Sequence, residues 1–562
     1  MTIADVFLRG GQVIDVLNRT ILQQDIGIVG KTFSLNATDG RQVVDLKGAY
    51  VAPGFIDAHM HVESTMLPPS GFCSLAAPHG TTAVVLDPHE IANVLGIAGI
   101  KLMMDDAAGL PIDCFFTASS CVPASPLETS GATLLADDLE PLFEDDRVIA
   151  LAEMMNYPGV INGDPEVHRK IQMGLRHGLV DGHCPGLRGE DLLKYIAAGI
   201  SSDHESTSAD EAQEKLDAGL QIYIREGSAA RNLAALLPII TAQNAKHICF
   251  CTDDRHPADL RDAGHIDNIV RKAIAMGLDP VLAICIASRH AAEHFGLDKH
   301  GAIESCRLAN FVVFDDLNNL KILQTWHHGR LVAENNKMVT TCSSSTDWKD
   351  AMHSVRLPEN LATESFRVQG NAALIRVIGL IQGQLITEEL HETPRVEEGA
   401  FVADPARDML KIAVIERHHN TGNIGLGFVR GFDFKGGAIA STVGHDAHNV
   451  AVVGDNDDDM LLAATTLGSQ GGLCVTSQEE VLAYLPLPIA GLMSDQSASV
   501  VIEQQQAVLD AVHELGCPLD DPFMPLSFLT LSVIPQLKLT DLGLIDVASF
   551  RVVPITLEAN SS

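Results

Sequence analysis

The middle of the chain, residues 53–299, alternates short apolar runs with helical patterns. Eight of the apolar runs have the length of buried strands, and each one ends in a polar residue. These last residues are His59, Asp87, Ser120, Glu153, His183, His204, Glu226 and Asp253. Several gaps between the runs show helical periodicity, as in residues 266–274, where apolar positions share one face. Eight strands alternating with helices predict an α/β fold, a (β/α)8 TIM-type barrel.

Both flanks of this middle region have a different pattern. Residues 1–52 alternate short apolar segments with Gly and Asn turns, and residues 300–335 repeat that pattern, which is typical of small β-structure. We expect the two stretches to form one small β-sandwich. Residues 336–365 become polar and indicate a linker. Residues 366–562 combine strand-like runs with at least two helices, which predicts an additional C-terminal α+β domain.

Composition narrows the class of protein. The 562 residues are 46% hydrophobic and 20% charged, as expected for two or three globular domains. A net charge of −35 argues against nucleic acid and anionic membranes as partners. The apolar runs are too short to cross a bilayer, and the first residues lack the features of a signal peptide. The 11 scattered cysteines fit reduced thiols, so we expect a cytoplasmic protein, with a homodimer or higher homo-oligomer as the default assembly.

The strand ends carry the chemistry. His59 and His61 close the first strand, and alternation puts residues i and i+2 on one side, where both imidazoles can meet one cation. Taken singly, each His could instead cap a strand by hydrogen bonding. The further His, Asp and Glu residues at later strand ends favour the metal interpretation, because reactive groups in this fold lie at the carboxyl ends of the strands.

The later strand ends extend the same donor set. Glu153 can bridge two metals or complete one, His183 and His204 offer neutral nitrogen ligands, and Asp253 offers an oxygen beside the reacting water. Mixed imidazole and carboxylate ligands suit zinc, iron or manganese. A metal-acidified water beside a strand-end carboxylate predicts hydrolysis at an sp2 carbon.

Several other polar residues have two readings. Asp87, His89 and Glu90 could line the site or cap a helix start, and Ser120 could donate to a bound ligand or serve as a cap. Glu205 would point away from the site on a continued strand, unless the turn after His204 re-aims it and makes it a candidate acid. Arg225 and Glu226 fit either a ligand contact or a buried ion pair. In the C-terminal region, a second metal site, a lid over the barrel mouth and an interface network all remain open for His418, His419, His445, Asp446 and His448.

Consecutive segments of the chain resemble one known family. GFIDAHMHVEST, HGTTAVVLDPHEIANVLG, DGHCPGL, SDHESTSADEA and CTDDRHPADL are similar to signatures of the adenine deaminases of the amidohydrolase superfamily. RHHNTGNIGLGFVRGF and STVGHDAHN resemble the extra C-terminal domain of that family. The chain departs from the family pattern at ESCRLANF and at IASRHAAEHFGL, and neither segment contains a proposed ligand.

The resemblance implies a binuclear divalent centre, with manganese or iron favoured and zinc possible. Its ligands would be His59, His61, Glu153, His183, His204 and Asp253. We expect Asp253, Glu153 and His204 to be catalytic, and the substrate to contact Asp254, Glu90, His89, Ser120 and Glu226. The implied reaction is hydrolytic deamination of adenine to hypoxanthine and ammonia by a metal-bound hydroxide, in purine salvage. The alternatives are another aminopurine, a cyclic amide, or a non-catalytic scaffold, which would be expected to have lost ligands.

Overall fold

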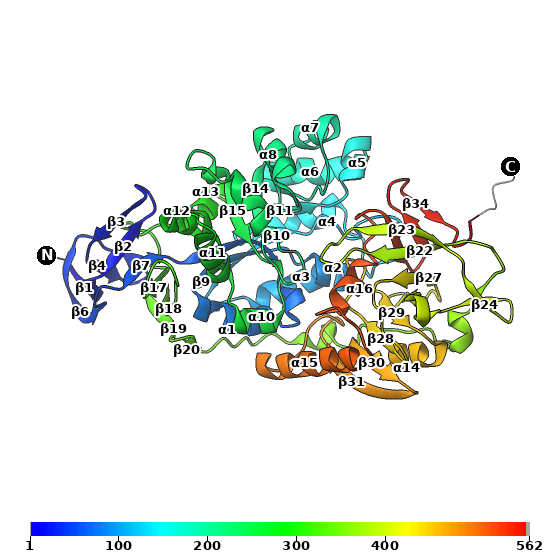
Figure 1. The fold of residues 1–562 in the computed structure, drawn as a ribbon. Coiled ribbons are helices and arrows are strands. Elements are labelled where there is room, and N and C mark those ends of the chain that lie inside the picture. Colours follow the sequence, from blue (N-terminus) through cyan, green and yellow to red (C-terminus); the bar gives the residue numbers. More distant parts are fainter. Residues whose placement is uncertain (1, 558–562) are drawn as a thin grey trace.

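The computed structural model describes residues 2–557. The molecule is elongated and has three parts along its length, with the two ends of the chain at opposite ends (Figure 1). Two small sheets lie at the N-terminal end, a barrel occupies the middle, and a group of sheets and helices lies at the C-terminal end. The barrel therefore has a neighbour at each end of its axis, and only one of them meets the carboxyl ends of its strands.

Parallel strands form the barrel. They are β8 (Phe55–His61), β9 (Thr81–Leu86), β10 (Asp113–Ala118), β11 (Val148–Met154), β12 (Leu179–Gly182), β13 (Ser202–Asp203), β14 (Gln221–Arg225), β15 (Ile248–Cys251) and β16 (Asp253–Asp254). Strands β12 to β8 and β16 form one sheet and β13 to β15 another, and neighbouring strands in both are parallel. The Ser201 N–H donates to the Val180 carbonyl at 2.9 Å and joins the two sheets between β12 and β13. Each of the eight predicted runs contains a strand, and this arrangement fits the predicted TIM-type barrel.

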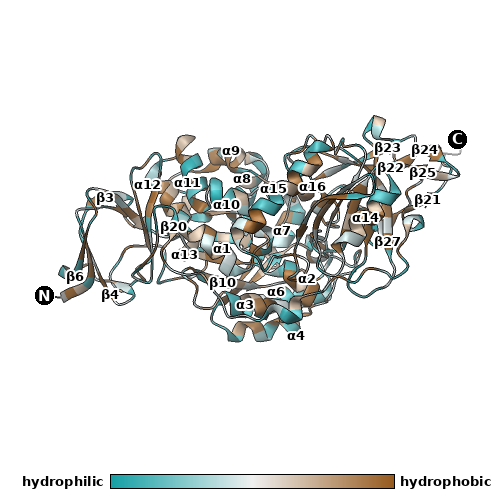
Figure 2. Ribbon diagram, turned by 90° about the horizontal axis from the view of Figure 1, so that it is seen from below, coloured by the Kyte–Doolittle hydropathy of each residue, from teal (hydrophilic) through white to brown (hydrophobic). Residues whose placement is uncertain are grey.

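Helices α1 to α9 lie in the intervals between these strands, and α10 to α13 follow the last strand. They are α1 (Pro69–Ala76), α2 (His89–Leu95), α3 (Ile97–Asp106), α4 (Ala136–Leu139), α5 (Tyr157–Asn162), α6 (Pro165–His177), α7 (Gly189–Ala197), α8 (Ala209–Asp217), α9 (Leu233–Leu236), α10 (Pro257–Asp262), α11 (Ile266–Ala275), α12 (Pro280–Cys285) and α13 (Ala291–His294). The outer helices carry both hydrophobic and hydrophilic residues along their turns (Figure 2). In α11, for example, Ile266, Ile269, Val270 and Ala273 are buried, as the periodicity predicts.

Two sheets form the N-terminal part. The strands are β1 (Thr2–Arg9), β2 (Gln12–Asp15), β3 (Thr20–Gln23), β4 (Ile26–Val29), β5 (Thr32–Phe33), β6 (Ala37–Asp45) and β7 (Tyr50–Pro53), joined after the barrel by β17 (Phe311–Phe314), β18 (Ile322–His327), β19 (Arg330–Glu334) and β20 (Lys337–Met338). One sheet has the order β5-β4-β1-β6 and the other β20-β19-β18-β17-β7-β2-β3. Strand β17 pairs with β7, so residues from before and after the barrel share one sheet. Leu8, Ile28, Phe311 and Trp326 belong to one hydrophobic core between the sheets.

The C-terminal part is built on an eight-stranded sheet of order β23-β22-β27-β26-β29-β28-β30-β31. The strands of this part are β21 (Val368–Gln369), β22 (Ile375–Leu380), β23 (Thr387–Glu392), β24 (Arg395–Glu397), β25 (Ala400–Val402), β26 (Leu410–Ile415), β27 (Ile424–Arg430), β28 (Ala438–Ser441), β29 (Val450–Gly454), β30 (Gly472–Ser477), β31 (Glu480–Pro486), β32 (Leu537–Thr540), β33 (Gly543–Asp546) and β34 (Arg551–Val553), and its helices are α14 (Asp457–Leu467), α15 (Ala498–Glu514) and α16 (Phe523–Phe528). Because side chains alternate along β26, Ile412 and Val414 pack with α15, whereas Ala413 and Ile415 pack with α14. The large sheet therefore has a hydrophobic core on each face.

Residues 341–347, inside the predicted linker, have neither helix nor strand. The segment after them is nevertheless packed, because Ala351 is buried and its carbonyl accepts a hydrogen bond from the Ala490 N–H at 2.8 Å. All 11 cysteines are free thiols. Within residues 2–557, no helix combines the length and apolar character needed to span a bilayer.

Candidate active site and metal centre

The side chains predicted at the strand ends converge on one cavity at the carboxyl end of the barrel. The polar groups that line it are His61, His89, Glu90, Glu153, His183, His204, Glu205, Arg225, Asp253, Asp254, His445 and Asp446. Met155, Phe528, Leu531 and Ile534 complete the lining. The cavity volume is about 20 Å³, where one water needs about 10–15 Å³, so a planar base requires part of this wall to shift.

Glu153 lies at the centre of the predicted ligand set. Its Oε1 lies 3.3 Å from Nε2 of His61 and 3.6 Å from Nε2 of His59. Its Oε2 lies 2.6 Å from Nδ1 of His183 and 3.3 Å from Nε2 of His204. The two oxygens of one carboxylate thus face two separate pairs of imidazoles.

Asp253 completes the first of these two groups. Its Oδ1 lies 3.1 Å from Nε2 of His61 and 3.5 Å from Nε2 of His59. The backbone of Asp253 has a positive φ of 57°, which interrupts the strand between β15 and β16. Neighbours on a regular strand point to opposite sides, but here Asp253 and Asp254 both line the cavity. We refer to His59, His61, Glu153, His183, His204 and Asp253 as the mouth cluster.

The mouth cluster fits a divalent metal. His59, His61 and Asp253 place one donor atom each within 4.8 Å of one another, as do His59, Glu153 and His204, and also His183, His204 and Glu205. Nε2 of His59 is buried and has no hydrogen-bond partner, although two carboxylate oxygens lie near it. A buried polar atom without a partner costs about 1–3 kcal/mol, and coordination of a cation would remove that cost.

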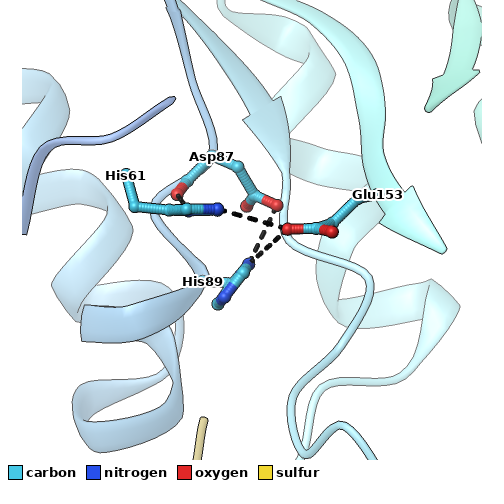
Figure 3. Close-up of side chains that lie close together, drawn as sticks. All are labelled: His61, Asp87, His89 and Glu153. Atoms are coloured by element: carbon cyan, nitrogen blue, oxygen red, sulfur yellow. Dashed lines mark hydrogen bonds and ion pairs between the residues drawn. The ribbon is translucent and has the colours of Figure 1, made fainter. Parts of the chain in front are cut away.

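A backbone contact orients His61, and Figure 3 shows the residues around it. Nδ1 of His61 lies 3.0 Å from the carbonyl oxygen of Asp87, which leaves Nε2 directed at Glu153. The Asp87 carboxylate lies 3.0 Å from Nδ1 of His89, and that nitrogen is 3.6 Å from Glu153. Asp87 and His89 therefore lie directly beside the mouth cluster.

Arg225 connects two carboxylates at the edge of the mouth cluster. Its guanidinium donates to Glu205 at 2.5 and 2.8 Å and also to Asp253 Oδ2. For Glu205 the structure has the turn that the sequence leaves open, because β13 ends at Asp203 and the following loop brings Glu205 into the cavity. Of the two readings of Arg225, the structure has the buried ion pair.

The electrostatic surroundings keep the ligand carboxylates ionised. Burial favours a raised pKa for Glu153, but the charges of His204 and His183 outweigh it and hold the pKa well below its usual value. Burial also favours a raised pKa for Asp253, and the Arg225 charge outweighs that effect, so its pKa is well below the usual value. Ionised carboxylates are the form that binds metals.

Asp254 has the opposite electrostatic character. Burial, together with the charge of Asp253, raises the pKa of Asp254. The hydroxyl of Ser64 donates to Asp254 Oδ1 and holds its carboxyl at the cavity wall. Ser64 lies in the short 3-10 helix Val62–Thr65 that directly follows β8, so the turn after the first barrel strand supports the end of the last one.

Two predicted substrate contacts are absent from the lining described above. The hydroxyl of Ser120 donates to the backbone carbonyl of Glu153 at 2.6 Å. The carboxylate of Glu226 accepts a hydrogen bond from Lys272 at 2.7 Å and another from the Leu233 N–H at 3.2 Å. Both side chains are thus engaged in structural contacts, and for Glu226 the structure has the buried ion pair that was the alternative reading.

A loop of the C-terminal part reaches over the barrel mouth. His445 and Asp446 line the cavity, and Nδ1 of His445 lies 2.6 Å from Oε1 of Glu90. His448 contacts the other oxygen of Glu90, and the His445 ring stacks on Phe528 with centroids 4.3 Å apart. The motif around residue 445 therefore lies over the site, and Glu90, at the start of α2, is the barrel residue that it contacts.

The neighbouring motif makes interface contacts. Nε2 of His418 lies 2.6 Å from the Ala447 carbonyl, and Nε2 of His419 lies 2.9 Å from the Ser130 carbonyl. Asn449 donates to the Thr129 carbonyl at 2.8 Å, and Asp541 accepts from the Thr129 hydroxyl at 2.7 Å. The contacts of His419, Asn449 and Asp541 join the C-terminal part to the loop that follows β10, whereas that of His418 lies within the C-terminal part.

Sequence reasoning missed the apolar wall of the cavity. Met155 follows the strand of Glu153, while Phe528, Leu531 and Ile534 come from α16 and the segment after it. An apolar residue at a site has the same local pattern as one in a core, so only the long-range fold identifies it. The clustering of Phe, Leu, Val and Ile in residues 523–534 without helical periodicity is the one available signal.

Comparison with known proteins identifies the family. Residues 50–332 match the amidohydrolase family, and residues 384–551 match the adenine deaminase C-terminal domain. The chain is 44% identical to adenine deaminase of Desulfatibacillum aliphaticivorans, over 98% of this chain and 97% of the relative. It is 44% identical to that of Methanothrix thermoacetophila (99% and 97%) and 45% identical to that of Nitratidesulfovibrio vulgaris (97% and 95%).

Among solved structures, β-aspartyl dipeptidase of Fervidobacterium islandicum AW-1 is similar at 14% identity with a TM-score of 0.46, covering 60% of this chain and 99% of that one. The sequence relatives extend over nearly the whole chain, at identities well above those that chance produces. Both the barrel and the C-terminal part have a counterpart in them. The chain therefore belongs to the adenine deaminase family of the amidohydrolases.

Proposed function

We propose that this protein is a metal-dependent hydrolase that deaminates adenine to hypoxanthine and ammonia. One observation carries the chemistry: the two oxygens of Glu153 face separate pairs of imidazoles, beside Asp253 and at the cavity at the barrel mouth. The similarity of nearly the whole chain to adenine deaminases, at 44% identity, supports adenine as the substrate.

The mouth cluster would hold two divalent ions, manganese or iron in preference and zinc as the alternative. His59, His61 and Asp253 would hold one, His183 and His204 the other, and Glu153 would bridge them. When bound, such ions supply Lewis acidity and make water a nucleophile near neutral pH. The ligand set contains only imidazoles and carboxylates, which suits all three metals.

Asp253 would act as the base of the reaction. It accepts a proton from the water that attacks C6 of adenine, and the C6–N bond then breaks as the amine takes up a proton and leaves as ammonia. Arg225 is the positioning residue, because it holds Asp253 Oδ2 and leaves Oδ1 directed at His59 and His61. The oxygen of the water becomes the carbonyl oxygen of hypoxanthine.

Asp446 is the proposed acid for the leaving amine. It lines the cavity, and both of its oxygens are buried without a hydrogen-bond partner. Burial and the charge of Glu90 raise the pKa of Asp446 to about 7, against the opposing charges of His89 and His445. A carboxyl group with that pKa is about half protonated at pH 7, and its protonated form can donate the proton. His89, Glu90 and Asp254 would contact the base edge, whereas Ser120 and Glu226 would support the site from behind.

The remaining assignments follow the sequence predictions. We assign residues 1–52 with 300–335 to a small β-sandwich, 53–299 to the barrel, 336–365 to the linker and 366–562 to the C-terminal domain. We also propose a homo-oligomer that functions in purine salvage. The pairing of β7 with β17 supports the discontinuous first domain.

Ammonia release tests the substrate directly. The enzyme, loaded separately with manganese, iron or zinc, is assayed with adenine, adenosine, guanine, cytosine and hydantoin. Turnover of adenine alone is expected. Turnover of another aminopurine or of hydantoin in place of adenine would reassign the substrate, and no turnover with a fully loaded centre would favour the scaffold alternative.

A further inference from the structure

A second cluster of histidines lies at the opposite end of the barrel. Asp113 is the first residue of β10, whereas the mouth cluster lies at the carboxyl ends of the strands. The six residues of β10 rise about 3.3 Å each, so the two ends are about 20 Å apart. His300 follows α13, His327 is the last residue of β18, and His328 begins the turn into β19. We call Asp113, His300, His327 and His328 the foot cluster.

All three imidazoles of the foot cluster face the one carboxylate. Oδ1 of Asp113 lies 3.1 Å from Nε2 of His327 and 3.1 Å from Nε2 of His328. Oδ2 of Asp113 lies 2.9 Å from Nε2 of His300. Asp113, His327 and His328 each offer a ligand atom, and these atoms lie within 4.8 Å of one another.

Hydrogen bonding alone does not explain this arrangement. The His327 side chain is buried, with the residue 7% exposed, and its Nε2 has no hydrogen-bond partner of acceptable geometry although it faces Asp113. The rings of His327 and His328 are stacked, with centroids 3.9 Å apart and planes 20° apart, and Nε2 of each lies 3.1 Å from Oδ1 of Asp113. Nε2 of His328 also makes a hydrogen bond of 3.1 Å with Oδ2, whereas Nε2 of His327 makes none. A buried, unsatisfied nitrogen is costly in a protein interior.

We infer that the foot cluster is a separate binding site for one divalent transition-metal ion, with zinc as the preferred ion. Three imidazoles and one carboxylate complete a four-coordinate tetrahedral shell, the usual geometry of structural zinc. Ligand bonds of about 2.0–2.1 Å at tetrahedral angles separate ligand atoms by about 3.3 Å. His327 and His328 lie 3.1 Å from Oδ1 of Asp113, so this part of the shell would have to open by only a few tenths of an ångström. His300, 2.9 Å from the other oxygen of Asp113, would supply the remaining imidazole.

Asn310 holds two of the ligands in place. Its side-chain Nδ2 donates to Asp113 Oδ2 at 2.9 Å, and its Oδ1 accepts from the backbone N–H of His328 at 2.7 Å. His328 has a positive φ of 48° and is followed by Gly329, where a Cβ would lie 2.7 Å from the Gly30 carbonyl oxygen. This tight turn lets two consecutive histidines face the same carboxylate, which a regular strand does not allow.

The site would fasten three distant segments to one another. Asp113 belongs to the barrel, His327 and His328 to the sheet of the N-terminal part, and His300 to the connection between them. An ion that binds only the folded chain stabilises it by mass action. Its role would thus be structural, and it does not depend on the proposed deamination.

Zinc content tests the inference. The full-length chain is stripped with a chelator, reloaded with ZnCl2, desalted and analysed by mass spectrometry of the metal. We expect His327→Ala/His328→Ala to lose one zinc equivalent per chain relative to the unmodified protein, and to keep its deaminase activity. His391→Ala is the matched control, because His391 is exposed and pairs only with Glu389. Equal zinc content in the double variant and the unmodified chain would overturn the inference.

A second experiment tests the inference if the His327→Ala/His328→Ala variant folds poorly. In Glu153→Gln, which weakens the mouth cluster, we expect one tightly held zinc equivalent to remain and to raise the thermal midpoint. Replacement of that zinc by cobalt should give the visible absorption bands of a tetrahedral ion. A Glu153→Gln chain that retains no zinc, or whose thermal midpoint is indifferent to zinc, would show that the foot cluster is only a hydrogen-bond network.

Discussion

The mouth and foot clusters lie at opposite ends of the same barrel and differ in their balance of charge. At the mouth, Glu153, Glu205 and Asp253 lie among the imidazoles, and Arg225 offsets part of their charge. At the foot, Asp113 is the one carboxylate among three imidazoles, and a neutral amide, Asn310, supports it. Both sets of side chains suit a divalent cation.

The two clusters differ in the polar groups that remain beyond the candidate metal ligands. The foot cluster uses both oxygens of Asp113 on imidazoles. The mouth cluster adds acidic groups around a cavity, among them Asp254 and the unpaired carboxyl of Asp446. A site that only stabilises needs a complete ligand shell, whereas a site that catalyses needs further groups that exchange protons with the substrate.

The largest expected effect on activity comes from making the same Asp→Asn substitution at each end of the barrel. Asp253→Asn should lower kcat for adenine by about 10³-fold or more, since a positioned base contributes about 10²–10⁴-fold. Asp113→Asn makes the same chemical change at the foot and should leave kcat within about twofold, because it touches no reacting atom. Steady-state ammonia release with manganese-loaded enzyme measures both. Comparable losses in the two variants would remove the distinction between the clusters.

Asp446→Asn tests the acid that the C-terminal part adds to the mouth. We expect kcat to fall by about 10²-fold while the metal content stays unchanged. With a pKa of about 7, Asp446 is protonated below pH 7, so kcat in the unmodified enzyme should fall as the pH rises through about 7. The variant should lack this decline. A normal pH profile in Asp446→Asn would assign the proton to another group.

A smaller effect is expected when the residue that holds each cluster in place, Arg225 at the mouth or Asn310 at the foot, is replaced. Arg225→Lys keeps the charge but loses the planar fork that holds Glu205 and Asp253, so kcat should fall by about 10-fold or more with little change in KM. Asn310→Ala should instead weaken zinc binding at the foot by about 10–100-fold and leave kcat unchanged. Kinetics and zinc titration on both variants decide this. Loss of activity in Asn310→Ala would indicate that the two ends are coupled.

The sequence predicts the barrel and most of the mouth because both depend on local pattern. Polar residues at the ends of apolar runs indicate the strand ends, and alternation indicates that His59 and His61 share a side. Ile266, Ile269, Val270 and Ala273 are buried as predicted, whereas Ile274, at the edge of the predicted face, is half-buried. A periodicity identifies the centre of a buried face better than its edge.

The side-chain directions and contacts that local sequence pattern does not specify depend on backbone turns and on residues far apart in the chain. The end of β13 at Asp203 redirects Glu205, and the positive φ of Asp253 redirects Asp254. The contact of Glu90 with His445 joins residues that are far apart in the chain, as does that of Asp113 with His327. In a strand, the adjacent pair His327 and His328 would point to opposite sides, so the foot cluster has no signature in the local pattern.

The smallest expected effect concerns Lys538, which supports the apolar wall of the cavity. Its buried Nζ donates to the carbonyls of Phe528 and Leu385 at 3.0 and 2.8 Å. Burial lowers the pKa of Lys538 to about 7. Lys215 in the barrel is equally buried but pairs with Asp203 and Glu211, and their charges outweigh the effect of burial and raise its pKa.

These two lysines predict different responses to pH, because only Lys538 changes its protonation state on folding between about pH 7 and 10. Between about pH 7 and 10 the unfolded chain binds a proton at Lys538 that the folded chain lacks, so folding stability should rise with pH in this window. Lys538→Met should lose that rise, while its two unpaired carbonyls cost about 1–3 kcal/mol at any pH. Lys215→Met should destabilise throughout the window by about 3–5 kcal/mol, because it leaves buried carboxylates unpaired. Thermal midpoints at pH 6 and pH 9 measure both variants.

Since Lys538 holds the carbonyl of Phe528 at the cavity wall, Lys538→Met should also raise KM for adenine more than it lowers kcat. Parallel pH dependence in Lys538→Met and the unmodified chain would mean that this amine stays charged when buried.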